Sequence, residues 1–136
     1  MGHQSTLINN RDKAKQLLSF DGMQYGLCRP TDVDISMDFQ QKCFVFVELK
    51  TLGAPLTMGQ KIHLQGLVDA IVAGGRKAYA ILAHHSTPDC DHDVHCATAE
   101  VFSVYTGGRG GWDKVHPKTS LDDYIKTIHE NHRSSR

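Results

Sequence analysis

Two side chains of opposite charge follow an apolar stretch of this sequence. Residues 44–47 read Phe-Val-Phe-Val, and Glu48, Leu49 and Lys50 come next. Alternate side chains of a strand share a face, so Glu48 and Lys50 would lie side by side. Burying both charges costs several kcal/mol unless a partner compensates. The placement therefore predicts a chemical role for this carboxylate and this amine at the strand end.

Two further carboxylates precede this stretch, in residues 32–39. Asp32 and Asp34 lie on the polar side of an alternating pattern, whose apolar side holds Val33, Ile35, Met37 and Phe39. A turn at residues 40–42 would pair this strand with residues 43–50 and bring the aspartates beside Glu48. Carboxylates so close repel each other, and a divalent cation relieves the repulsion. Oxygen donors favour Mg²⁺ or Mn²⁺, so we expect Glu48 and Asp34, Asp32 or both as ligands.

Such a site suits the hydrolysis of a phosphodiester bond. The attacking water needs activation and the phosphate needs charge stabilisation, and a bound cation can provide both. Lys50 would orient the water or help to deprotonate it, because the pKa of a lysine falls on burial or beside a cation.

An aspartate followed by a hairpin and Glu-x-Lys resembles the PD-(D/E)xK nuclease superfamily. The two parts read Pro30-Thr31-Asp32-Val33-Asp34 and Glu48-Leu49-Lys50. Gly59-Gln60, which opens a predicted helix, looks like the Gly-Gln or Gln of Holliday junction resolvases and virus-type replication-repair nucleases. The resemblance covers about residues 23–85. Thr31 departs from the superfamily pattern, in which proline directly precedes the aspartate.

The resemblance implies roles for individual residues. Asp34, Glu48, Lys50 and Gln60 would be catalytic, and the spacing from Asp34 to Glu48 favours Asp34 over Asp32 as the first metal ligand. It further implies a restriction-endonuclease-like core and a Mg²⁺- or Mn²⁺-dependent DNA endonuclease selective for structure, as Holliday junction resolvases are. Branched DNA would be the substrate, and symmetric cleavage of a junction would require a homodimer.

The remaining elements follow from hydrophobic periodicity. Helices are predicted at residues 5–19, at 58–72 before Gly74-Gly75, and from Leu121 after a cap by Ser120. Gln60 lies on the apolar stripe of the second helix, and the last helix would bury Leu121, Tyr124, Ile125 and Ile128. Short strands are predicted at 23–27, 78–83 and 100–105, with a crossover making 78–83 parallel to 43–50. The expected fold is α/β, a mixed central sheet flanked by helices, in a single domain of residues 1–136.

The composition indicates the kind of partner and the cellular location to expect for the protein. The formal net charge is zero over 136 residues, so DNA affinity would need local patches. No stretch reaches the roughly 20 apolar residues of a membrane span, and the N-terminus does not read as a signal peptide. Four cysteines without a regular framework favour reduced thiols. We expect a cytoplasmic protein of a prokaryote or a phage-infected cell, with no membrane partner.

Other interpretations of these residues stay open. Glu48 and Lys50 could form an ordinary surface ion pair, and a basic face with Arg11, Lys13 and Lys15 is usually only solvated. The same fold could bind nucleic acid without cutting it, or bind zinc through Cys90, His92, His95 and Cys96. Those four lie within seven residues, unlike the separated ligand pairs of usual zinc sites, and we expect no zinc.

Overall fold

The computed structural model describes residues 18–54, 57–87, 92–108 and 111–133. Its contacts divide the chain into two compact units, Met1–Thr31 and Asp32–Arg136. In the first unit, the strand predicted at 23–27 is wrong. Gly26 takes a positive φ of 64° in a turn, leaving only an isolated bridge between Tyr25 and Cys28. Most of the helix predicted at 5–19 lies outside the described residues.

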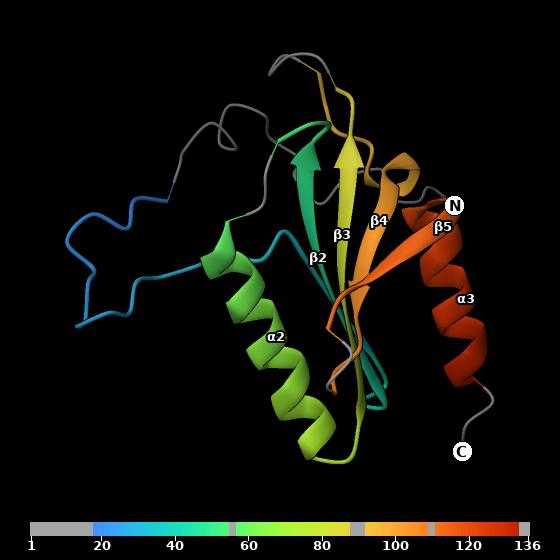
Figure 1. The fold of residues 1–136 in the computed structure, drawn as a ribbon, viewed down its shortest axis with the longest axis horizontal. Helices are drawn as coiled ribbons and strands as arrows, with labels where there is room; N and C mark the ends of the chain where they lie inside the picture. The colour runs from blue at the N-terminus through green and yellow to red at the C-terminus, as the bar shows by residue number, and fades with distance from the viewer. Residues whose placement is uncertain (1–17, 55–56, 88–91, 109–110, 134–136) are drawn as a thin grey trace, which may run out of the picture. The chain divides into compact units, whose positions relative to one another are not determined.

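The second unit is built on a mixed sheet of five strands (Figure 1). In spatial order they are β1 (Ile35–Phe39), β2 (Cys43–Thr51), β3 (Lys77–His85), β4 (Glu100–Tyr105) and β5 (Asp113–Ser120). β2 and β3 are parallel, and the other neighbours are antiparallel. The helices are α2 (Met58–Ala73), α3 (Leu121–Arg133) and the short 3₁₀ helix η1 (Cys96–Thr98). The predicted α/β class with a mixed sheet is confirmed.

The two long helices cover opposite faces of this sheet (Figure 1). Leu121 and Ile128 of α3 join an apolar cluster with Cys43, Val45 and Val47 of β2. Leu64 and Val68 of α2 pack against the other face, on Ala78, Ala80 and Leu82 of β3. Strands β2 and β3 thus contribute alternate residues to two separate cores.

The predicted hairpin of the first two strands is confirmed, but its first strand is shorter. Gln40 and Gln41 form the turn with positive φ angles of 56° and 65°, and Asp38 Oδ1 accepts a 2.6 Å hydrogen bond from the amide of Gln41. β1 begins only at Ile35, because the chain bends at Asp34. Beyond that bend Val33 packs in the α2 cluster, so it does not share a face with Ile35 as predicted.

Helix α2 and the crossover to β3 follow the prediction closely. The helix runs one residue beyond the predicted 58–72, to Ala73, and Gly74 caps its C-terminus. Ile62 and Val72 belong to the apolar periodicity from which this helix was predicted, but they are 60% and 39% exposed. Apolar residues occupy a wider arc of this helix than one sheet face covers, so only part of the arc is buried.

The C-terminal hairpin contains a strand that the apolar pattern does not show. Lys114, His116, Pro117 and Lys118 give β5 its polar character, which an edge strand tolerates because its outer groups need no partner. The predicted cap of α3 is present, since Ser120 Oγ accepts a 3.1 Å hydrogen bond from the amide of Asp123. Within the described ranges, no helix is long and apolar enough to cross a membrane.

Candidate active site

Asp34 and Glu48 meet where β2 approaches its C-terminal end. Ile35 pairs with Val47, so the preceding residue, Asp34, lies beside Glu48. Asp34 Oδ2 accepts a 2.7 Å hydrogen bond from the amide of Leu49, and its carboxyl group shares a hydrogen bond with that of Glu48. The bend at Asp34 therefore joins an aspartate to both the backbone and a carboxylate of the neighbouring strand.

Glu48 is a charged residue buried in the core, with only 4% of its surface exposed. It pairs with Leu82 in the β2–β3 register, which places it on the face covered by α2. Gln60, in the first turn of α2, donates a hydrogen bond from Nε2 to Glu48 Oε1 at 3.2 Å. Gln60, which was predicted on the apolar stripe of this helix, therefore faces the sheet at Glu48.

The start of α2 fixes the side chain of Gln60. Gln60 Oε1 accepts hydrogen bonds from the amide of Thr57 at 3.4 Å and from its hydroxyl at 3.2 Å. The hydroxyl of Thr57 also accepts a 3.2 Å bond from the amide of Gln60, which completes a capping box. The same contacts thus begin the helix and aim an amide at Glu48.

The environment of Glu48 raises its pKa from 4.5 to about 7. Burial contributes most, because it removes water from the charged form. The charge of Asp34 and its hydrogen bond act in the same direction, and the charge of Asp32 adds the smallest effect. Lys50 opposes them and lowers the pKa. Near neutral pH, Glu48 can therefore hold or release a proton.

Lys50 and the two aspartates have different relations to Glu48. Lys50 is half-buried two residues further along the strand and on the same face, opposite His84 of β3. Asp34 makes a direct hydrogen bond to Glu48, whereas Asp32 acts on it through charge. The structure thus places Asp34, rather than Asp32, against the buried carboxylate.

The carboxylates of the site offer oxygen donors to a divalent cation. Among the described residues, no three His, Cys, Asp or Glu side chains are grouped to hold a metal ion. Mg²⁺ commonly binds one or two carboxylates and takes its other ligands from water and substrate phosphate. The pair of Asp34 and Glu48 fits this mode, with hard oxygen donors whose mutual repulsion a cation would relieve.

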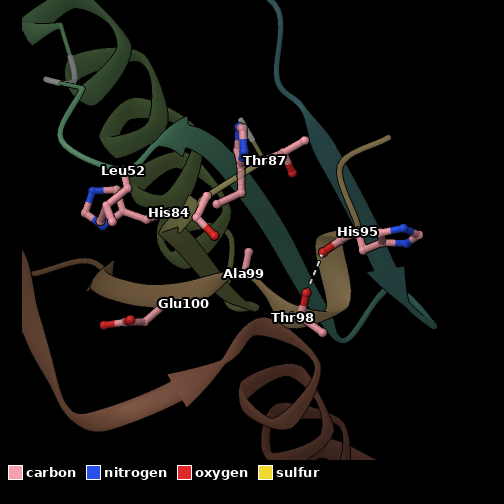
Figure 2. A pocket seen from close by; sticks show the side chains of 9 residues that line it. Leu52, His84, Thr87, His95, Thr98, Ala99 and Glu100 are labelled. Carbon is pink, nitrogen blue, oxygen red and sulfur yellow. Dashed lines mark hydrogen bonds between the residues drawn. The ribbon is translucent and has the colours of Figure 1, made fainter. Parts of the chain in front are cut away.

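The residues considered for zinc do not form such a group where the structure describes them. Cys90 lies outside the described residues, and His92, His95 and Cys96 belong to no three-ligand cluster. His95 and Glu100 instead line a cavity of about 240 Å³ beyond the end of β3. Figure 2 shows the ring of His95 turned away from His84 and Glu100.

Sequence reasoning missed three contributors to the site. The amide of Leu49 gives no signal in a side-chain pattern, because any residue other than proline supplies it. Thr57 could have been found, since Thr-x-x-Gln is the spacing of a capping box. His84 could be placed opposite Lys50 only after the β2–β3 register was known.

The second unit is therefore an α/β fold in which the exposed Asp34 meets the buried Glu48 at a sheet end, flanked by an amide and an amine. Comparisons of the chain with models of protein families, with curated proteins and with solved structures found no match. The geometry and chemistry of the site are the basis for the function proposed below.

Proposed function

We propose that this protein is a metal-dependent DNA endonuclease of the PD-(D/E)xK type, with a restriction-endonuclease-like core. The contact between Asp34 and the buried Glu48 is the observation that supports this proposal most. A surface ion pair of Glu48 and Lys50 would not explain why a carboxylate that is 4% exposed contacts a second carboxylate. A site that binds a cation and a phosphate would, because both carboxylates become favourable once the cation is present.

Each residue has a role that follows from its position. Asp34 and Glu48 would hold Mg²⁺ or Mn²⁺, and Asp32 is available as a further ligand. The cation would stabilise negative charge on the phosphate and favour ionisation of the attacking water. Gln60 holds Glu48 in place through its 3.2 Å hydrogen bond. Lys50 would orient the attacking water and balance the charge of the phosphate.

The direct test is cleavage of labelled linear, flap, single-stranded and four-way DNA with Mg²⁺, Mn²⁺ or a chelator. We expect cleavage that requires the cation and differs between these structures. DNA binding without cleavage under any of these conditions would instead favour a non-catalytic binding module. A zinc-binding scaffold would be shown by stoichiometric zinc in the purified protein.

The expected junction selectivity requires two active sites, which a twofold homodimer would supply. Leu121 and Ile128 of α3 are buried against the sheet, so they are not free to form its interface. β1 and β5 are the edges of the sheet and remain candidates. Light scattering should give twice the chain mass, and junctions should be nicked at symmetric positions. A monomer that prefers flaps or single strands would contradict the resolvase assignment alone.

A further inference from the structure

A second feature of the α2 face lies next to the candidate active site. It is a groove of about 480 Å³ whose lining includes Lys61, His84, Phe102, Ser103, Lys114 and His116. We call it the basic groove. α2, β3, β4 and β5 all contribute to it.

The groove adjoins the carboxylate site through the register of two parallel strands. Leu82, which lines the groove, is paired with Glu48, and His84 is paired with Lys50. Paired residues of neighbouring strands point to the same face. A molecule in the groove would therefore lie beside the residues proposed to cut it.

The charge of the groove lining has one sign. Lys61 and Lys114 bring two ammonium groups, and the lining, which consists of described residues, contains no carboxylate. The ammonium of Lys61 lies 5.7 Å from the centre of the Trp112 ring, an interaction that restrains the long side chain. Two positive groups over a protein of zero net charge form the local patch that an anionic ligand needs.

Two aromatic rings of the groove form a stacked pair. The centres of His84 and Phe102 are 3.8 Å apart, and their planes differ by 9°. Both rings line the groove and are half-buried. Flat rings beside positive charges are the combination with which proteins bind unpaired nucleotides, since bases stack on the rings and phosphates contact the charges.

We propose that the basic groove binds a single-stranded stretch of the DNA substrate, next to the phosphodiester bond that is cut. Lys61 and Lys114 contact its phosphates, and an unpaired base stacks on the pair of His84 and Phe102. The inference rests on the proposed nuclease function for the identity of its ligand. It narrows the substrate to DNA that has unpaired nucleotides beside the cleavage site.

The proposal is tested by binding in the absence of cleavage. The anisotropy of a labelled oligothymidylate is titrated with the full-length protein in EDTA, at several salt concentrations. Replacing one phosphate-contacting lysine should reduce the slope of log affinity against log salt by about 0.7 for a single strand. The variants are Lys61→Ala, Lys114→Ala and their combination. Lys77→Ala, an exposed lysine at the start of β3, is the matched control.

Stacking is tested separately from charge. His84→Ala should weaken binding of the oligothymidylate about tenfold, and His84→Tyr should restore much of the loss because it returns an aromatic face. Phe102 is left unchanged because it also packs in the α2 cluster. Circular dichroism and thermal melting of each variant establish that it folds.

The outcomes separate this proposal from the nuclease proposal. The groove is overturned as a binding site if the lysine variants show the same salt slope as Lys77→Ala and His84→Ala binds the oligothymidylate as tightly as the unmodified protein does. That result leaves the nuclease standing if Lys50→Ala still abolishes cleavage. Conversely, the expected binding losses in a protein that never cleaves DNA support the groove and refute the nuclease. The requirement for unpaired bases would be overturned if a blunt duplex bound as tightly as the oligothymidylate and if His84→Ala did not weaken binding of that duplex.

Discussion

The two faces of strand β2 carry very different residues. On the α3 face, Cys43, Val45 and Val47 are fully buried and apolar. On the α2 face, Phe44 and Phe46 are followed by Glu48 and Lys50, at the end where α2 begins. One strand therefore stabilises the fold with one set of alternate residues and positions charged groups with the other.

The two faces of β2 contribute differently to the stability of the fold. Burial of apolar side chains on the α3 face stabilises the folded protein. Burial of Glu48 instead disfavours its charged form and raises its pKa to about 7. The hydrogen bond from Gln60 offsets only part of this cost. Residues that lower stability yet sit in a defined network are typical of functional sites, so substitutions on the two faces should have opposite effects.

The largest effect is expected from Lys50→Ala. Removing a group that assists proton transfer should lower the cleavage rate by about 10²- to 10⁴-fold while leaving the fold intact. Single-turnover cleavage of the preferred DNA measures the rate, and circular dichroism checks the fold. Lys77→Ala is the control: Lys77 is the first residue of β3, and this variant should cleave like the unmodified protein. Undiminished cleavage by Lys50→Ala would refute the catalytic role of this lysine.

A smaller but clear effect is expected on cation binding. Asp34→Asn and Glu48→Gln should each weaken Mg²⁺ or Mn²⁺ binding at least about tenfold, because a neutral amide keeps an oxygen donor but loses its charge. Asp32→Asn should have less effect, since Asp32 influences Glu48 only weakly. Calorimetric titration measures all three affinities. Equal affinities in Asp34→Asn and the unmodified protein would show that Asp34 is not a ligand.

On the opposite face, Val47→Ala should reduce stability without changing the chemistry. Val47 is fully buried, and removing two of its carbons costs about 2 kcal/mol of unfolding free energy. Urea denaturation measures the loss, and the cleavage rate of the folded protein should stay near normal. Val94→Ala is the matched control, because Val94 is 37% exposed and its truncation should cost much less. A large loss of cleavage by folded Val47→Ala would remove the functional distinction between the faces.

Much of this organisation could be predicted from the sequence because it depends on periodicity and local turns. The hairpin, α2, the parallel crossover to β3 and the cap of α3 all follow from such patterns. Strand β5 was missed because an edge strand containing Pro117 needs neither apolar alternation nor a full ladder of hydrogen bonds.

The site was predictable in its residue types but not in its contacts. Glu48 and Lys50 stood out because charged groups ended a core strand, and Gln60 stood out through the resemblance to known nucleases. The resemblance already favoured Asp34 over Asp32, but no pattern revealed the bend at Asp34 or its hydrogen bond to the amide of Leu49. The stacking of His84 on Phe102 joins strands distant in sequence, so it required the sheet register.

Glu48, on the α2 face of β2, should also make the stability of the protein depend on pH. Between pH 4.5 and about 7, folded Glu48 keeps a proton that the unfolded chain releases. The native state then binds more protons, so the free energy of unfolding falls as pH rises through this range.

Glu48→Gln removes that titration, so the variant should be more stable than the unmodified protein at pH 8, by about 3 kcal/mol. Near pH 5 the difference should be small, because Glu48 is then protonated in the folded protein. Urea denaturation in EDTA at a series of pH values measures the two stabilities. If the difference in stability does not grow with pH, the pKa of Glu48 is not raised in the folded protein. A difference that grows as expected, in a variant that has also lost cation binding, would show that one buried carboxylate both lowers stability and serves the site.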